Sequence, residues 1–87
     1  MGLYLVELQL AGISSERLDA VSAALNEACQ RLALSGTTVT FLRGTFVPDT
    51  GRCLCLFEAA SPTTVRLANE LAQLPLVRIE TVKEVPT

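Results

Sequence analysis

Residues 52–69 read RCLCLFEAASPTTVRLAN, and they place a strand directly before a helix. Apolar side chains recur at every second position from Cys53 to Phe57, which is the period of a strand. Ser61 is a favourable helix N-cap, and Pro62 suits the first helical position, where its missing N–H is not needed. The stretch therefore predicts a strand over 52–58 and a helix that begins after Ser61 and stops before Pro75.

Similar signals on either side of this stretch complete the order of elements. Residues 3–10 alternate like a strand, Ser14 caps a helix that ends at Ser35-Gly36, and residues 38–47 are rich in strand-forming residues. The turn PDTG at 48–51 joins the latter to 52–58 as a hairpin, and residues 78–84 predict a last strand. Right-handed crossovers in this βαββαβ order predict one α+β domain over 1–87. We expect a ferredoxin-like plait, with a four-stranded antiparallel sheet and both helices on one face.

Composition excludes several classes of protein. The chain has 87 residues, of which 49% are hydrophobic, with seven basic and nine acidic residues, three cysteines and no histidine. Without a basic patch interleaved with aromatics, we expect no nucleic-acid partner. The apolar runs are too short to cross a bilayer, and the N-terminus lacks a signal-peptide pattern. With its cysteines reduced, we expect a cytoplasmic protein that has no membrane partner.

Cys53 and Cys55 share one face of their strand. Same-face residues on a strand are roughly 6.5 to 7 Å apart, which is too far for easy disulfide geometry. A zinc site needs about four ligands, and this chain has no histidine. We therefore expect both thiols, and Cys29 on the first helix, to be small apolar side chains in the core. Metal or redox chemistry is the alternative.

The other face of the sheet is expected to point away from the helices. Antiparallel sheets can face water on one side, but that side is then polar. This one is largely apolar, so we expect a second copy of the chain to cover it with two-fold symmetry. The residues placed on it are Leu3, Leu5, Phe41, Leu54, Leu56 and Val82, together with Glu7, Arg43, Glu58 and Glu80.

Glu7 and Glu58 are the candidate functional carboxylates. We expect them on parallel neighbouring strands, converging with Arg43 nearby. Two carboxylates could bind a hard cation, or one could accept a proton with a raised pKa. The alternative is an ion-paired rim that sets the register of a dimer. No phosphate-binding loop, Ser-His-Asp set or HExxH motif is present, so we name no catalytic residue.

Three segments resemble a small bacterial family known as a domain of unknown function: YLVE at 4–7, RCLCLFEA at 52–59 and SPTTVRLANELAQLPLVRIETV at 61–82. The resemblance covers nearly the whole chain and implies a ferredoxin-like fold that tends to dimerise. The family is similar to a nickel-binding protein whose site is built largely from histidines. Glu7, Glu58 and Asn69 match the family pattern, and Asn69 stands where some relatives carry histidine. Nickel favours imidazole, which this chain lacks, so we expect no metal and no cofactor.

Three functions remain open from the sequence. The leading interpretation is a non-catalytic homodimer that binds a small ligand or partner over its open sheet face. Its candidate ligand-binding residues are Glu7, Arg43, Glu58 and Asn69. One alternative is a nickel-type metal-binding protein that uses carboxylates, Asn69 and a thiol. The other is a small enzyme of the dimeric α+β barrel kind, with a substrate cavity on the sheet.

Overall fold

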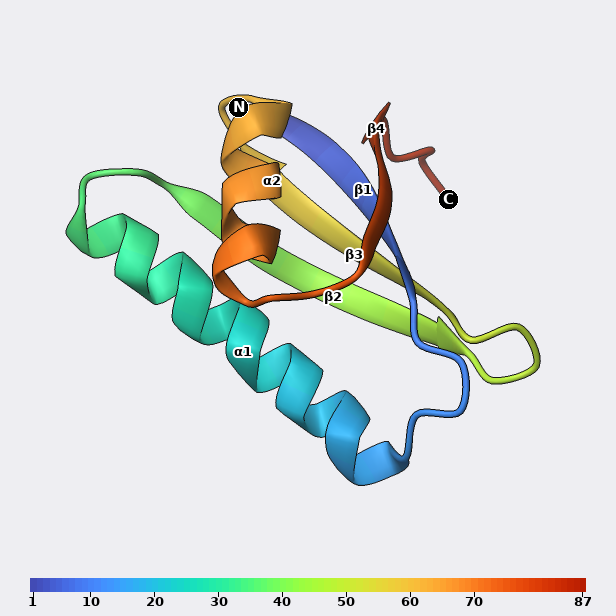
Figure 1. Cartoon of the computed structure of the whole chain (residues 1–87). Coiled ribbons are helices and arrows are strands. Elements are labelled where there is room, and N and C mark those ends of the chain that lie inside the picture. The colour runs from blue at the N-terminus through green and yellow to red at the C-terminus, as the bar shows by residue number, and fades with distance from the viewer.

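The computed structural model describes all 87 residues and contains four strands and two helices. In chain order these are β1 (Gly2–Gln9), α1 (Ser15–Leu34), β2 (Val39–Val47), β3 (Arg52–Ala59), α2 (Pro62–Leu71) and β4 (Leu76–Val82). The strands form one antiparallel sheet in the order β2-β3-β1-β4. Both helices lie on one side of that sheet (Figure 1). The predicted ferredoxin-like plait is confirmed.

Both helices begin at the predicted caps. The Ser14 hydroxyl accepts a hydrogen bond from the Arg17 backbone N–H, and the Ser61 hydroxyl accepts one from the Thr64 backbone N–H. These bonds satisfy N–H groups that have no partner inside the helix. Neither helix combines the length and apolar character that crossing a bilayer requires.

The core lies between the sheet and the two helices. Strands β1 and β3 send alternate side chains into it, including Val6, Leu8, Cys55 and Phe57, all of which are almost completely buried. The helices supply the other side, which includes Leu25, Leu32, Val65 and Ala68. The alternation of β1 and β3 therefore follows the sequence pattern, and their remaining side chains point away from the helices.

Phe41 does not lie on the open side of the sheet, contrary to our expectation. The pairing of β2 with β3 shifts between Phe41 and Arg43, which leaves Leu42 as an extra residue. Phe41 lies opposite Phe57 with ring centroids 5.3 Å apart, whereas Arg43 lies opposite Leu56 on the other side. A bulge of this kind breaks the simple alternation, so strict period-2 counting assigned Phe41 to the wrong face.

The expectation that Glu7 and Glu58 lie on parallel neighbouring strands is also wrong. Strands β1 and β3 are antiparallel, with Glu7 opposite Leu54 and Glu58 opposite Leu3. The two carboxylate positions are four residues apart along the strand direction, which is roughly 13 Å. In this topology each parallel pair of strands is separated by a strand from the other half, so direct neighbours run in opposite directions.

Candidate functional site

The side of the sheet that faces away from the helices is called the open face here. Its centre is apolar and is formed by Leu3, Leu5, Leu54, Leu56 and Val82. Leu56 is only 6% exposed, although no helix covers it.

Residues 83–87, the tail that follows β4, line a groove together with Leu5, Leu54 and Leu56 of this face. The Glu84 carboxylate meets the Arg43 guanidinium, with Nη2 and Oε1 2.7 Å apart. Strands β2 and β4 are opposite edges of the sheet, roughly 14 Å apart. An ion pair between a residue of β2 and one that follows β4 requires the tail to lie back across the open face. A groove of about 500 Å³ remains between the tail and the sheet, lined by Leu5, Leu54, Leu56, Thr45 and Val85 among others.

Glu7 lies near one end of the open face, between two arginines. Its Oε1 is 3.1 Å from Arg78 Nε and its Oε2 is 3.4 Å from Arg52 Nε. Arg78 also reaches Glu80, at 3.6 Å. Arg43, which we expected near Glu7, instead pairs with Glu84. Both oxygens of Glu7 therefore already face a guanidinium group, and a metal ion would have to displace at least one of them.

Glu58 and Asn69 do not join Glu7. Glu58 is exposed, and it makes no ion pair. Asn69 lies on α2 and is 1% exposed. Its Nδ2 donates to the Val65 carbonyl at 2.9 Å, whereas its Oδ1 has no hydrogen-bond partner. The structure thus places the four candidate residues at separate points and assembles no single site from them. Their roles in binding stay predictions.

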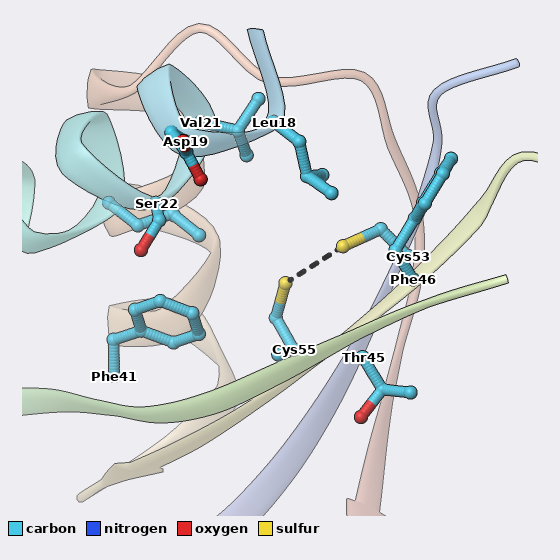
Figure 2. Close-up of a pocket in the computed structure, with 11 residues that line it drawn as sticks. Leu18, Asp19, Val21, Ser22, Phe41, Thr45, Phe46, Cys53 and Cys55 are labelled. Atoms are coloured by element: carbon cyan, nitrogen blue, oxygen red, sulfur yellow. Dashed lines mark hydrogen bonds between the residues drawn. The ribbon is translucent and has the colours of Figure 1, made fainter. Parts of the chain in front are cut away.

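A pocket that the sequence reasoning missed lies on the helix side, between α1 and the β2–β3 hairpin. Its volume is about 160 Å³, and Cys53 and Cys55 lie side by side in its wall, with their sulfur atoms 3.8 Å apart (Figure 2). Leu18 and Val21 of α1 line it from above, and Phe41 and Phe46 of β2 line it from the sides. All three cysteines are free and buried, as predicted.

The sequence feature that could have indicated this pocket is Gly44, a glycine inside strand β2. It lies opposite Cys55 in the sheet, and it lines the pocket without a side chain. A Cβ atom built there would be 3.4 Å from the Phe41 ring and 3.7 Å from Cys55 Sγ. A side chain larger than alanine at this position would therefore extend into the space beside the sulfur.

Burial favours the protonated form of two of the three thiols, Cys29 and Cys55. Burial, together with the charge and hydrogen bond of the neighbouring Cys53, raises the pKa of the Cys55 thiol to about 12. Burial also raises the pKa of Cys29. No three side chains among cysteine, aspartate and glutamate come close enough together to hold one metal ion.

Comparison with known proteins gives a family and a fold. The family model described as "Nickel responsive protein SCO4226-like" matches residues 4–82. The crystal structure of SCO4226 from Streptomyces coelicolor A3(2) superimposes with a TM-score of 0.83 at 21% sequence identity, covering 97% of this chain and 99% of that one. No curated protein matches the sequence. At this identity the structural likeness establishes the fold alone.

Proposed function

The chain belongs to the nickel responsive protein SCO4226-like family, and within that family we propose that it acts as a non-catalytic homodimer. The open face meets a second copy, and the groove on it takes a small ligand or a partner. The observation that carries this proposal is the apolar centre of the open face, which has only the chain's own tail over it. Apolar surface of this kind is stabilised by burial against another surface.

The charges around the apolar centre support a contact between identical copies. One end of the open face carries Glu7 with Arg52 and Arg78. A two-fold contact repeats the same patch on both copies, so a border that carries both signs is able to meet itself without net repulsion. Charged residues at the edge of an interface determine how the two surfaces align more than they strengthen the binding.

We do not expect this chain to bind nickel through a site built from the usual nitrogen donors. Nickel is bound well by imidazole, and the chain has no histidine. Of the two carboxylates that match the family pattern, Glu7 has both oxygens facing arginines, and Glu58 is roughly 13 Å away along the sheet. The donor set does not fit nickel, so we expect calorimetric titration with nickel chloride to give no dissociation constant below about 1 μM.

Two carboxylates on the open face are paired with arginines, which disfavours the enzyme alternative. A general base must be free to reach the proton that it takes. Glu7 is held by Arg52 and Arg78, and Glu84 is held by Arg43. We also propose a reducing, cytoplasmic setting, because the three cysteines are free and buried.

The oligomeric state tests the proposal directly. We expect light scattering at micromolar concentration to give twice the chain mass of 9.3 kDa. Thr45 lines the groove and is exposed, so Thr45→Lys should leave the monomer folded while it places an unpaired charge in the contact. Leu67→Lys is the matched control, because Leu67 is 41% exposed on α2, on the far side of the sheet. A monomeric wild type, or a Thr45→Lys protein that still dimerises like the control, would contradict the proposal.

A further inference from the structure

We propose that the pocket between α1 and the β2–β3 hairpin binds a small aromatic amine, with the ring among the apolar side chains and the ammonium group beside Asp19. This pocket is on the helix side of the sheet, so the inference does not depend on the open face or on the contact between copies. Three features carry it: the size and apolar interior of the pocket, the glycine in its wall, and the single charge at its mouth.

The interior of the pocket has the size and the character to hold one aromatic ring. Its volume is about 160 Å³, and an apolar cavity of about 150 Å³ takes up benzene. Leu25, Cys53 and Cys55 are buried in its lining, and the rings of Phe41 and Phe46 are half-buried beside them (Figure 2). Aromatic rings and thiols make favourable contacts with a second ring. A bound ring would therefore be surrounded by groups that stabilise it better than water does.

Gly44 keeps the interior of the pocket open. Its backbone does not have the positive φ that favours glycine, so the local conformation accepts other residues. A Cβ atom there would make only ordinary contacts with Phe41 and Cys55. Glycine inside a strand lowers its stability, and it often marks a place where a ligand approaches closely. The backbone and its neighbours thus tolerate a side chain at this position, and the space left without one is available to a ligand.

The mouth of the pocket carries one negative charge. Among the lining residues, Asp19 and Ser22 of α1 are exposed to solvent, and Asp19 is the one charged residue of the lining. A ligand whose ring fills the interior places its substituent toward these exposed residues. The Asp19 carboxylate attracts a cationic substituent and repels an anionic one. An amine is therefore favoured over an alcohol of the same shape, and a carboxylate is disfavoured.

Titration of the isotope-labelled full chain with benzylamine, followed by the NMR signals of the backbone amides, tests the proposal. We expect saturable shifts centred on the residues that line the pocket, with a dissociation constant below about 5 mM, which is realistic for so small a ligand. Benzyl alcohol has the same ring without the charge, and it should bind roughly two- to five-fold more weakly, as expected for an exposed ion pair. Benzoate should bind more weakly than benzyl alcohol.

Two substitutions test the interior and the mouth of the pocket separately. Gly44→Leu places a side chain in the space of the ring, so it should weaken the binding of benzylamine and of benzyl alcohol several-fold. Asp19→Asn should remove the preference for the amine and leave the binding of benzyl alcohol unchanged. Glu27→Gln is the matched control for the change of charge, because Glu27 is exposed on α1 and does not line the pocket. It should keep the preference of the wild type.

Several results would overturn the inference. In the wild type these are a dissociation constant for benzylamine above about 5 mM, shifts centred outside the pocket, or benzyl alcohol or benzoate binding as tightly as the amine. In the variants they are an Asp19→Asn protein that keeps the preference for the amine, or a folded Gly44→Leu protein that binds as tightly as the wild type. The wild-type titrations and the exposed Asp19→Asn change decide the question even where Gly44→Leu does not fold.

Discussion

The Cys55 thiol shows how one buried group ties the stability of this protein to pH. Its pKa is raised by burial from its ordinary value of 9.0 to about 12 in the folded chain. The folded state therefore holds the proton more tightly than the unfolded state does. The resulting stability is complete below pH 9 and is lost as the pH rises toward 12.

Replacement of Cys55 should remove that dependence. We expect the free energy of unfolding of the wild type to fall more steeply between pH 9 and about 12 than that of Cys55→Ala. Urea titrations at intervals across this range measure both slopes, and the two proteins differ in no other titratable group. Equal slopes would mean that the Cys55 thiol loses its proton as readily in the folded chain as in the unfolded one.

Glu7 is the most enclosed carboxylate of the ion-paired end of the open face. Its side chain is 13% exposed, whereas that of Glu80 is 56% exposed. Glu7→Gln leaves two arginines without a shared partner, so we expect a loss of about 1 kcal/mol in unfolding free energy, and Glu80→Gln should change it by less than about 0.5 kcal/mol. Urea unfolding at low and high salt compares the two variants. A Glu7→Gln protein as stable as Glu80→Gln would mean that the Glu7 ion pairs contribute nothing.

Asn69 carries a buried carbonyl oxygen that has no partner. Such a group lowers stability by about 1 to 3 kcal/mol relative to one that is hydrogen-bonded. Leucine has a similar size and favours helices more strongly, so we expect Asn69→Leu to raise the free energy of unfolding by about 1 kcal/mol despite losing the bond to Val65. Urea unfolding measures it. A destabilised variant would indicate that Asn69 makes a polar contact, such as one to a bound water, that offsets its burial.

At the scale of elements, the bulge in β2 decides which aromatic side chain supports the core. Phe41 lies against Phe57, while Leu42 is 44% exposed as the extra residue. Phe41→Ala should therefore lower the free energy of unfolding by about 2 kcal/mol, and Leu42→Ala should change it by less than about 0.5 kcal/mol. Urea unfolding of the two variants checks this. A larger loss of stability for Leu42→Ala than for Phe41→Ala would contradict the bulge. It would mean that Leu42, and not Phe41, lies in the core, as unbroken alternation along the strand predicts.

The elements could be predicted from the sequence because their signals are local. The Ser14 and Ser61 caps and the alternation of β1 and β3 each act within a few residues, and each appears where expected. No local sequence signal marks the bulge at Leu42, because the residues before and after it both have the pattern of a strand. Its position is set by the packing of Phe41 on Phe57, a contact between different strands.

The candidate site was harder to predict than the fold because it depends on contacts between distant residues. Glu7 was chosen correctly as a residue of the open face, but its partners Arg52 and Arg78 come from β3 and β4. Arg43 pairs with Glu84 only because the tail turns back over the sheet. These ion pairs depend on the register between neighbouring strands and on the turn that the chain makes after β4. Neither can be predicted from the spacing of residues within one strand.

At the scale of the whole molecule, the sheet separates a packed core from a face that only the tail covers. The helix side buries Phe57, Leu8 and Leu25 completely, and it does not involve residues 83–87. The tail is held through Arg43 and Glu84, whose side chains are 66% and 55% exposed. An ion pair this exposed contributes about 1 kcal/mol at most. The tail is therefore bound weakly compared with the core beneath it.

Removal of residues 83–87 should accordingly strengthen self-association while leaving the fold intact. The deletion exposes Leu56 and its neighbours on the open face, and a second copy no longer has to displace the tail to cover them. We expect the dimer dissociation constant, measured by sedimentation at several concentrations, to fall several-fold, with little change in circular dichroism. Glu84→Gln is the milder companion variant, because it loosens the tail without exposing as much apolar area, and it should shift the constant in the same direction by less. A deletion that produces monomers would show instead that the tail is itself part of the contact between copies.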